Sequence, residues 1–157
     1  MKRTALEVLA SGLSLLALSG SAESQSAAEA YKPGLGDMMG AIQMRHAKLW
    51  FAGKSRNWDL AAYEISEIKE GFESAAKFQP DFKGRPVARM VEESTLQPIK
   101  NLEKAVESKN SALFAKAFDQ LTGACNSCHQ AAGFQFISIR KPSASPFTNQ
   151  DYGLQKH

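Results

Sequence analysis

The sequence predicts an all-α protein, an antiparallel four-helix bundle followed by an irregular C-terminal tail. Apolar residues recur at steps of three and four along four successive segments, and short breaks rich in Gly, Pro or Asn separate these segments. No pair of alternating apolar runs flanks a hairpin turn, so a sheet is not expected. Amphipathic helices joined by short links bury their apolar faces by packing against one another in alternating directions.

The first two helices are expected at residues 35–52 and 57–78. Gly53 suits the C-terminal cap of the first, and Asn57 suits the N-terminal cap of the second. The expected apolar stripes consist of Leu35, Met39, Ile42, His46 and Leu49 in the first helix, and of Ala61, Ile65, Ile68, Phe72 and Ala75 in the second. Charged residues of the second helix should lie mostly on its polar face, namely Glu64, Glu67, Lys69 and Glu70.

The third helix is expected at residues 86–109, with Pro86 as its first residue. Pro98 removes a backbone donor in its middle, which predicts a kink or two short helices near residues 95–98. Asn110 or Ser111 should cap the fourth helix. One side of the fourth helix is expected to carry Leu113, Ala117, Leu121, Ala124 and Cys128.

The N-terminal segment has the features of a secretory signal peptide. Lys2 and Arg3 precede a mostly apolar run at residues 8–18, and small residues follow up to Ala22. Glu7 is unusual so near an apolar run, and an N-terminal anchor or a cytosolic helix is the alternative. Export would place the protein in the periplasm. No apolar stretch reaches 18 residues, so no membrane span is expected in the mature protein.

These features divide the 157-residue chain around a single folded domain. The expected parts are a signal peptide (1–22), a flexible lead (23–34), the four-helix-bundle domain (35–132) and a C-terminal extension (133–157).

The charge balance and the motif content exclude several classes of function. The formal net charge is +3, and deleting residues 1–22 removes two basic residues and one acidic residue, which leaves +2. This value is too small to favour nucleic-acid binding, and no dense basic run is present. No acid/base pair, Ser/His/Asp set or phosphate loop has usable spacing, so we do not expect an enzyme.

The sequence Cys125-Asn126-Ser127-Cys128-His129 is the motif that points to a chemical function. Cys-x-x-Cys-His is the attachment motif for a c-type haem. Residues three apart share one helix face, so both sulfurs can bond to the vinyl groups on one porphyrin edge. The adjacent imidazole would bind the iron, and its other ring nitrogen should donate to a carbonyl oxygen. We therefore predict one covalent haem c, bound through Cys125 and Cys128, with His129 as an iron ligand.

The two cysteines have three alternative interpretations. A secreted chain with two cysteines can hold a disulfide, and a thioredoxin-like redox pair would need a βαβ context. A zinc site would need a fourth ligand, for which the chain offers only His46 and His157.

A helical bundle with Cys-x-x-Cys-His near the end of its fourth helix resembles the class II cytochromes c, the cytochrome c-prime group. The resemblance covers about residues 35–132. It implies that Cys125 and Cys128 form the thioether bonds and that His129 is the proximal ligand. Two departures indicate a divergent branch. About 25 residues follow the motif, and the segment from His46 to Trp58 differs from the typical sequence there.

The sixth iron ligand separates the functions that this resemblance implies. Antiparallel packing would bring the start of the first helix beside the end of the fourth, and Met39 shares the apolar stripe there. We expect Met39 as the ligand, as in low-spin relatives with Met near the start of the first helix. Met38, Met44 and His46 are the alternatives, as is an open position. His46 lies about 10 Å further along the helix axis than Met39.

With a sixth protein ligand, the expected function is electron transfer with redox partner proteins. An open position would instead favour binding of nitric oxide or carbon monoxide. A third option is a haem subunit that docks on a larger oxidoreductase through the extension at residues 133–157. Relatives often dimerise through their first two helices, which makes a homodimer an option.

Overall fold

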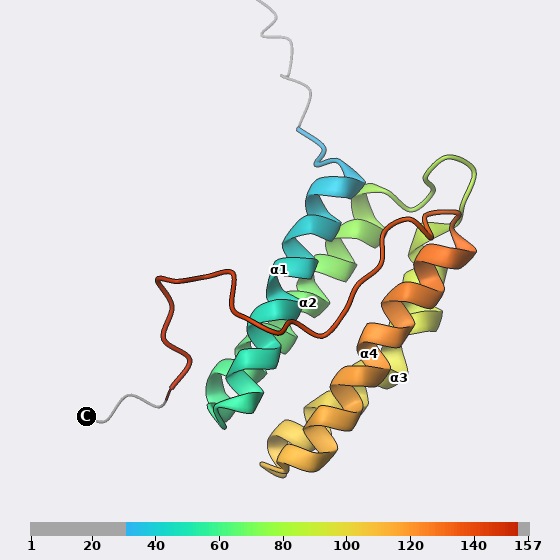
Figure 1. Cartoon of the computed structure of the whole chain (residues 1–157). Coiled ribbons are helices and arrows are strands. Elements are labelled where there is room, and N and C mark those ends of the chain that lie inside the picture. The colour runs from blue at the N-terminus through green and yellow to red at the C-terminus, as the bar shows by residue number, and fades with distance from the viewer. Residues whose placement is uncertain (1–30, 154–157) are drawn as a thin grey trace, which may run out of the picture. The chain divides into compact units, whose positions relative to one another are not determined.

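The computed structural model describes residues 31–153. The expected signal peptide, residues 23–30 of the expected lead and His157 lie outside the described residues. Within this range the protein is all-helical, and it contains no strand beyond an isolated bridge between Phe82 and Arg85. The helices are α1 (Leu35–Lys54), α2 (Trp58–Phe78), α3 (Val87–Glu107) and α4 (Ser111–Ala131). The expectation of an all-α four-helix bundle is confirmed (Figure 1). None of these helices combines the length and the apolarity needed to cross a membrane.

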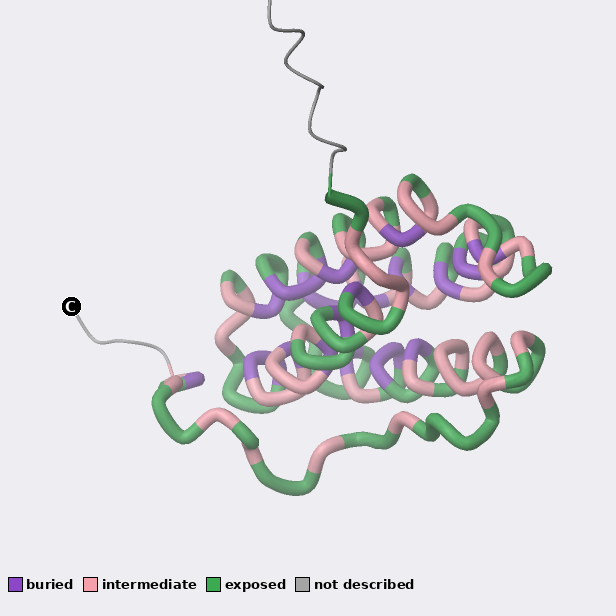
Figure 2. The backbone as a smooth tube through the Cα atoms, turned by 90° about the horizontal axis from the view of Figure 1, so that it is seen from above, coloured by how far each residue is buried: buried purple, intermediate pink, exposed green. Residues whose placement is uncertain are grey.

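The helices pack unequally around the core. α1 makes its most extensive contacts with α2, and α3 makes its own with α4, whereas α1 and α4 approach each other at few points. Buried residues of all four helices form one apolar cluster (Figure 2). The largest fully buried apolar side chains are Phe114, Phe118, Leu49, Ile68, Leu102 and Leu121.

Two asparagines begin helices, as expected from their capping preference. The Asn57 side chain accepts a hydrogen bond from the Leu60 amide. Asn110 accepts hydrogen bonds from the amides of Ala112 and Leu113, so Asn110 rather than Ser111 caps α4.

The expected role of Gly53 as a C-terminal cap is wrong, because α1 continues to Lys54 and Ser55 is the cap. Gly53 is buried inside the helix, and a Cβ atom there would lie 2.2 Å from the Phe114 ring. The position needs glycine because α4 approaches the α1 backbone there, and not because the helix ends.

α3 is a single helix across Pro98, so of the two expected alternatives, a kink or two short helices, the second is wrong. Pro86 caps this helix, which begins at Val87. Thr95 and Ile99 are buried on either side of Pro98, and tertiary packing on both sides holds the helix together despite the missing donor.

Two residues depart from the expected helix faces. Leu113 is 52% exposed, whereas Phe114 and Phe118 join Ala117 and Leu121 on the buried face of α4. Glu64 was expected on the polar face of α2, yet it is 1% exposed. An Arg45 Nη1 atom lies 3.4 Å from a Glu64 carboxylate oxygen and compensates for its burial.

After α4 the chain returns along the bundle without regular secondary structure. In Figure 1 this segment leaves the end of α4, passes between α4 and α1, and crosses α1. We call residues 133–153 the tail. Most of it is exposed or half-buried, whereas Tyr152 is buried and packs against Phe51 of α1.

Candidate functional site

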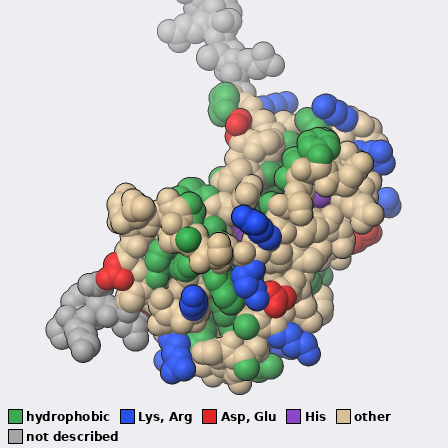
Figure 3. All heavy atoms as spheres, viewed as in Figure 1, with side chains coloured by type: hydrophobic (Ala, Val, Ile, Leu, Met, Phe, Trp, Pro, Cys, Tyr) green, Lys and Arg blue, Asp and Glu red, His purple; other side chains and the backbone are tan. Residues whose placement is uncertain are grey.

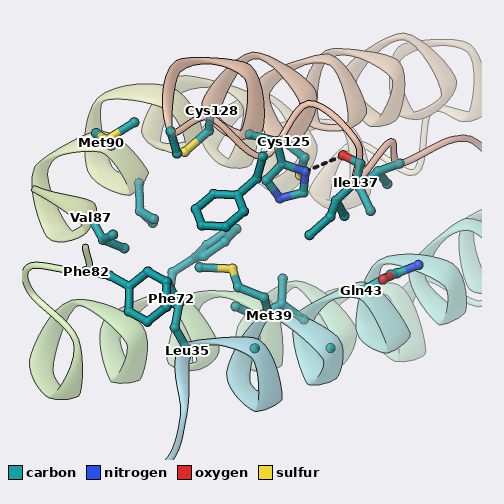
Figure 4. Close-up of a pocket in the computed structure, with 18 of the residues that line it drawn as sticks. Leu35, Met39, Gln43, Phe72, Phe82, Val87, Met90, Cys125, Cys128 and Ile137 are labelled. Atoms are coloured by element: carbon teal, nitrogen blue, oxygen red, sulfur yellow. Dashed lines mark hydrogen bonds between the residues drawn. The ribbon is translucent and has the colours of Figure 1, made fainter. Parts of the chain in front are cut away.

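A cavity of about 340 Å³ lies where the first turns of α1 meet the last turns of α4. Its volume falls in the usual range for ligand pockets, which is roughly 300–1,000 Å³. Its wall is mainly apolar and also includes residues from α2, α3 and the tail (Figure 4). The residues that line it include Met39, His46, Met90, Cys125, Cys128, His129, Ile137 and Ile139.

Cys125 and Cys128 line this cavity from adjacent turns of α4 as free thiols. Burial raises the pKa of Cys125 to about 11 and also raises the pKa of Cys128. Reactive dithiols instead have a lowered pKa, because the thiolate is the nucleophile. The folded chain therefore presents two neutral sulfurs to an apolar space, which disfavours the alternative of a thioredoxin-like redox pair.

His129 lines the same cavity, and the tail determines which of its ring nitrogens is available. Its Nδ1 atom lies 2.8 Å from the Ile137 carbonyl oxygen (Figure 4, dashed line). A carbonyl accepts only, so Nδ1 donates the proton and Nε2 keeps its lone pair. Nε2 has no hydrogen bond among the described residues, and an imidazole in this tautomer can bind a metal ion through Nε2.

The segment of the tail that follows Ile137 is attached to α4 by another residue of the same motif. The Asn126 side-chain amide donates to the Ile139 carbonyl oxygen at 2.8 Å, and the Ile139 amide donates to Asn126 Oδ1 at 2.7 Å. This two-bond contact attaches the tail to α4 only two residues beyond Ile137. The sequence showed that Asn126 lies inside the motif, but it did not reveal its partner.

The structure separates the four sixth-ligand candidates into two groups. Met39 and His46 line the cavity, whereas Met38 and Met44 do not. Met38 is buried in the core, and Met44 is 37% exposed. Figure 4 shows the Met39 side chain extending from α1 into the cavity, on the side opposite Cys125 and Cys128 of α4.

Met90 of α3 is a cavity residue that the sequence argument missed. Figure 4 draws its side chain among those that line the cavity. Its position one turn from Val87, on the inward stripe of α3, was the available signal. All the sixth-ligand candidates expected from the sequence lie in the first helix, whereas Met90 lies in the third.

His46 is the only buried imidazole in the described part of the chain. Its Nε2 atom lies 2.9 Å from the Thr122 hydroxyl, which lies 2.9 Å from the Phe118 carbonyl oxygen, and its ring packs on Phe118. Burial lowers the pKa of His46 to about 4, so the ring is neutral at pH 7. A neutral imidazole in a cavity can accept or donate a hydrogen bond, or bind a metal ion.

The residues of the cavity fit a covalently bound haem. Two thiols from adjacent turns, an imidazole held in the metal-binding tautomer and a mainly apolar wall meet in one space. A protein-only metal site has less support, because residues 31–153 contain no group of three or more His, Cys, Asp or Glu side chains placed to hold an ion.

A scan against models of known protein families, a search of curated proteins and a search of solved structures each found no match to this chain.

Proposed function

We propose that the chain is an exported, periplasmic monohaem c-type cytochrome that transfers electrons. We propose further that its helices form an antiparallel bundle of the cytochrome c-prime group, with the haem bound at the end of α4. The observation that carries this proposal is the meeting of Cys125, Cys128 and His129 at one apolar cavity, with the His129 Nδ1 atom on a backbone carbonyl.

When bound, a haem c supplies one-electron chemistry, since its iron alternates between the ferrous and ferric states. The protein residues have four tasks around it. Cys125 and Cys128 would provide the sulfurs of the thioether bonds, and His129 Nε2 would bind the iron. Met39, which extends into the cavity from α1, would provide a second protein ligand. The apolar wall limits water at the site, which is one of the factors that set a reduction potential.

Gas binding is the second candidate function, and His46 is the observation that favours it. If Met39 did not coordinate, the neutral, buried imidazole could donate its Nε2 proton to a small diatomic ligand in place of the Thr122 hydroxyl.

The decisive experiment is a mass and spectral measurement on full-length protein from a host that matures c-type cytochromes. We expect the polypeptide mass to increase by one haem, and we expect low-spin visible spectra in both oxidation states. High-spin spectra in both states would support gas binding instead of electron transfer. A colourless protein would contradict both functions. Replacing both cysteines by alanine should remove the covalent haem, whereas Ser127→Ala, in the same motif, should leave it attached.

A further inference from the structure

We infer that the tail is a strap that tunes the axial ligand, with Asn126 as the positioning residue that holds the Ile137 carbonyl against His129 Nδ1. The inference rests on the proposed haem function and assigns a role to the chain beyond α4.

The contact at Asn126 can position the Ile137 carbonyl, because two hydrogen bonds hold the nearby backbone of Ile139. The Asn126 side chain both donates to and accepts from the backbone of Ile139. A single hydrogen bond would let the tail rotate, whereas the paired bonds fix the local backbone orientation. Ile137 is two residues away, and its carbonyl oxygen meets His129 Nδ1 at 2.8 Å. One motif residue therefore aligns the acceptor for another residue of the same motif.

The remainder of the tail is anchored across the seam where α1 and α4 make few contacts. Lys141 pairs with Asp119 of α4 at 2.6 Å and lies over the Trp50 ring of α1. Further along, Lys48 of α1 lies over the Phe147 ring, and the Asn57 side chain donates to the Gly153 carbonyl oxygen. On the face that Figure 3 shows, several Lys and Arg side chains lie near the centre, beside apolar side chains. The strap is thus attached to α4, to α1 and to the N-terminal cap of α2.

The hydrogen bond has a specific consequence for an axial histidine. A carbonyl acceptor on Nδ1–H increases the basicity of the imidazole, and a more basic ligand stabilises ferric iron. Losing the acceptor should therefore raise the reduction potential. Simple opening of the cavity would act in the opposite direction, because water favours the more highly charged ferric state. A raised reduction potential would therefore indicate that the tail tunes His129, whereas a lowered potential would indicate that the tail only shields the cavity from water.

The test compares full-length holoprotein carrying Asn126→Ala with the wild type and with two controls. Ser127→Ala changes an exposed motif residue, and Lys141→Ala loosens the strap beyond the Asn126 contact. We expect Asn126→Ala to raise the reduction potential and to speed exchange of the His129 Nδ1 proton at least about tenfold, as measured by NMR on histidine labelled with nitrogen-15. Both controls should stay within about twofold of the wild-type exchange rate. An unchanged rate in Asn126→Ala, or a lowered potential, would overturn the inference.

A measurement on the wild type covers the case in which Asn126→Ala fails to fold. The Ile139 amide should be protected from hydrogen exchange even though it lies in an irregular segment, and His129 should carry its proton on Nδ1. Free exchange of the Ile139 amide would overturn the inference. Both wild-type measurements can also be made without haem. A result that contradicts the proposed function, namely no haem attachment, is therefore distinguishable from a result that contradicts the role of the tail, namely loss of its hydrogen bonds to Asn126 and His129.

Discussion

At the scale of single residues, the two proposed functions differ in whether Met39 binds the haem iron. Met39→Ala should remove the charge-transfer band that methionine coordination gives in the oxidised protein, because the thioether extends from α1 into the cavity. Visible absorption spectroscopy checks this outcome. Met38→Ala is the matched control, since Met38 is buried in the same turn but does not line the cavity. A band that survives in Met39→Ala and disappears in Met90→Ala would move the ligand to α3.

His46 predicts how stability depends on pH. Its pKa is about 4 in the folded protein, whereas that of an unfolded histidine is near 6.5. The unfolded chain therefore binds the proton first as the pH falls. The free energy of unfolding should consequently decrease between about pH 6.5 and 4, by up to about 3 kcal/mol from this residue.

Urea denaturation of the wild type and of His46→Gln at pH 7 and pH 4 measures this contribution. Glutamine can still hydrogen-bond to Thr122 but does not titrate, so the variant should lose less stability on acidification than the wild type. Equal losses in the two proteins would show that His46 is not buried as the structure has it.

At the scale of helices, Gly53 determines how closely α1 approaches α4. Gly53→Ala should destabilise the protein by about 1–3 kcal/mol, because the added methyl group meets the Phe114 ring. Gly123→Ala in α4 is the matched control, since its Cβ would contact nothing within 4 Å. The control should gain about 0.5–1 kcal/mol from helix propensity. Thermal or urea unfolding measures both variants, and a Gly53→Ala protein as stable as the control would refute the close approach.

α2 and α4 illustrate why periodicity alone identifies helices better than it orients them. Apolar residues lie on more than one side of α4, and both a Leu113 stripe and a Phe114 stripe satisfy helical spacing. The structure buries Phe114, which offers the larger apolar surface. Glu64 is buried because a partner on α1 reaches it, and that partner is remote in sequence.

At the scale of the whole molecule, the cavity predicts that the bundle depends on its cofactor. An apolar space of about 340 Å³ leaves its wall without packing partners unless a ligand fills it. Protein in which alanine replaces Cys125 and Cys128, isolated without haem, should therefore unfold about 10 °C below the holoprotein. Differential scanning calorimetry checks this difference. Equal melting temperatures would mean that the cavity closes by itself or that the haem does not fill it.

The four helices and the two asparagine caps could be predicted from the sequence, which also contains the Cys-x-x-Cys-His motif. These features depend on neighbours within about four positions along the chain, since helical periodicity, capping and Cys-x-x-Cys-His spacing are all local. The expectation that the second nitrogen of His129 meets a carbonyl also came from the sequence, and the hydrogen bond to Ile137 agrees with it.

Met39 was expected beside the end of the fourth helix, but the full set of residues that line the cavity could not be predicted from the sequence. The structure places Met39, His46 and Met90 there, leaves Met38 and Met44 outside, and attaches the tail to Asn126. These contacts join residues of different helices or of the tail. Their formation depends on how the helices approach one another and on where an irregular segment finds hydrogen-bond partners, and no local pattern encodes either.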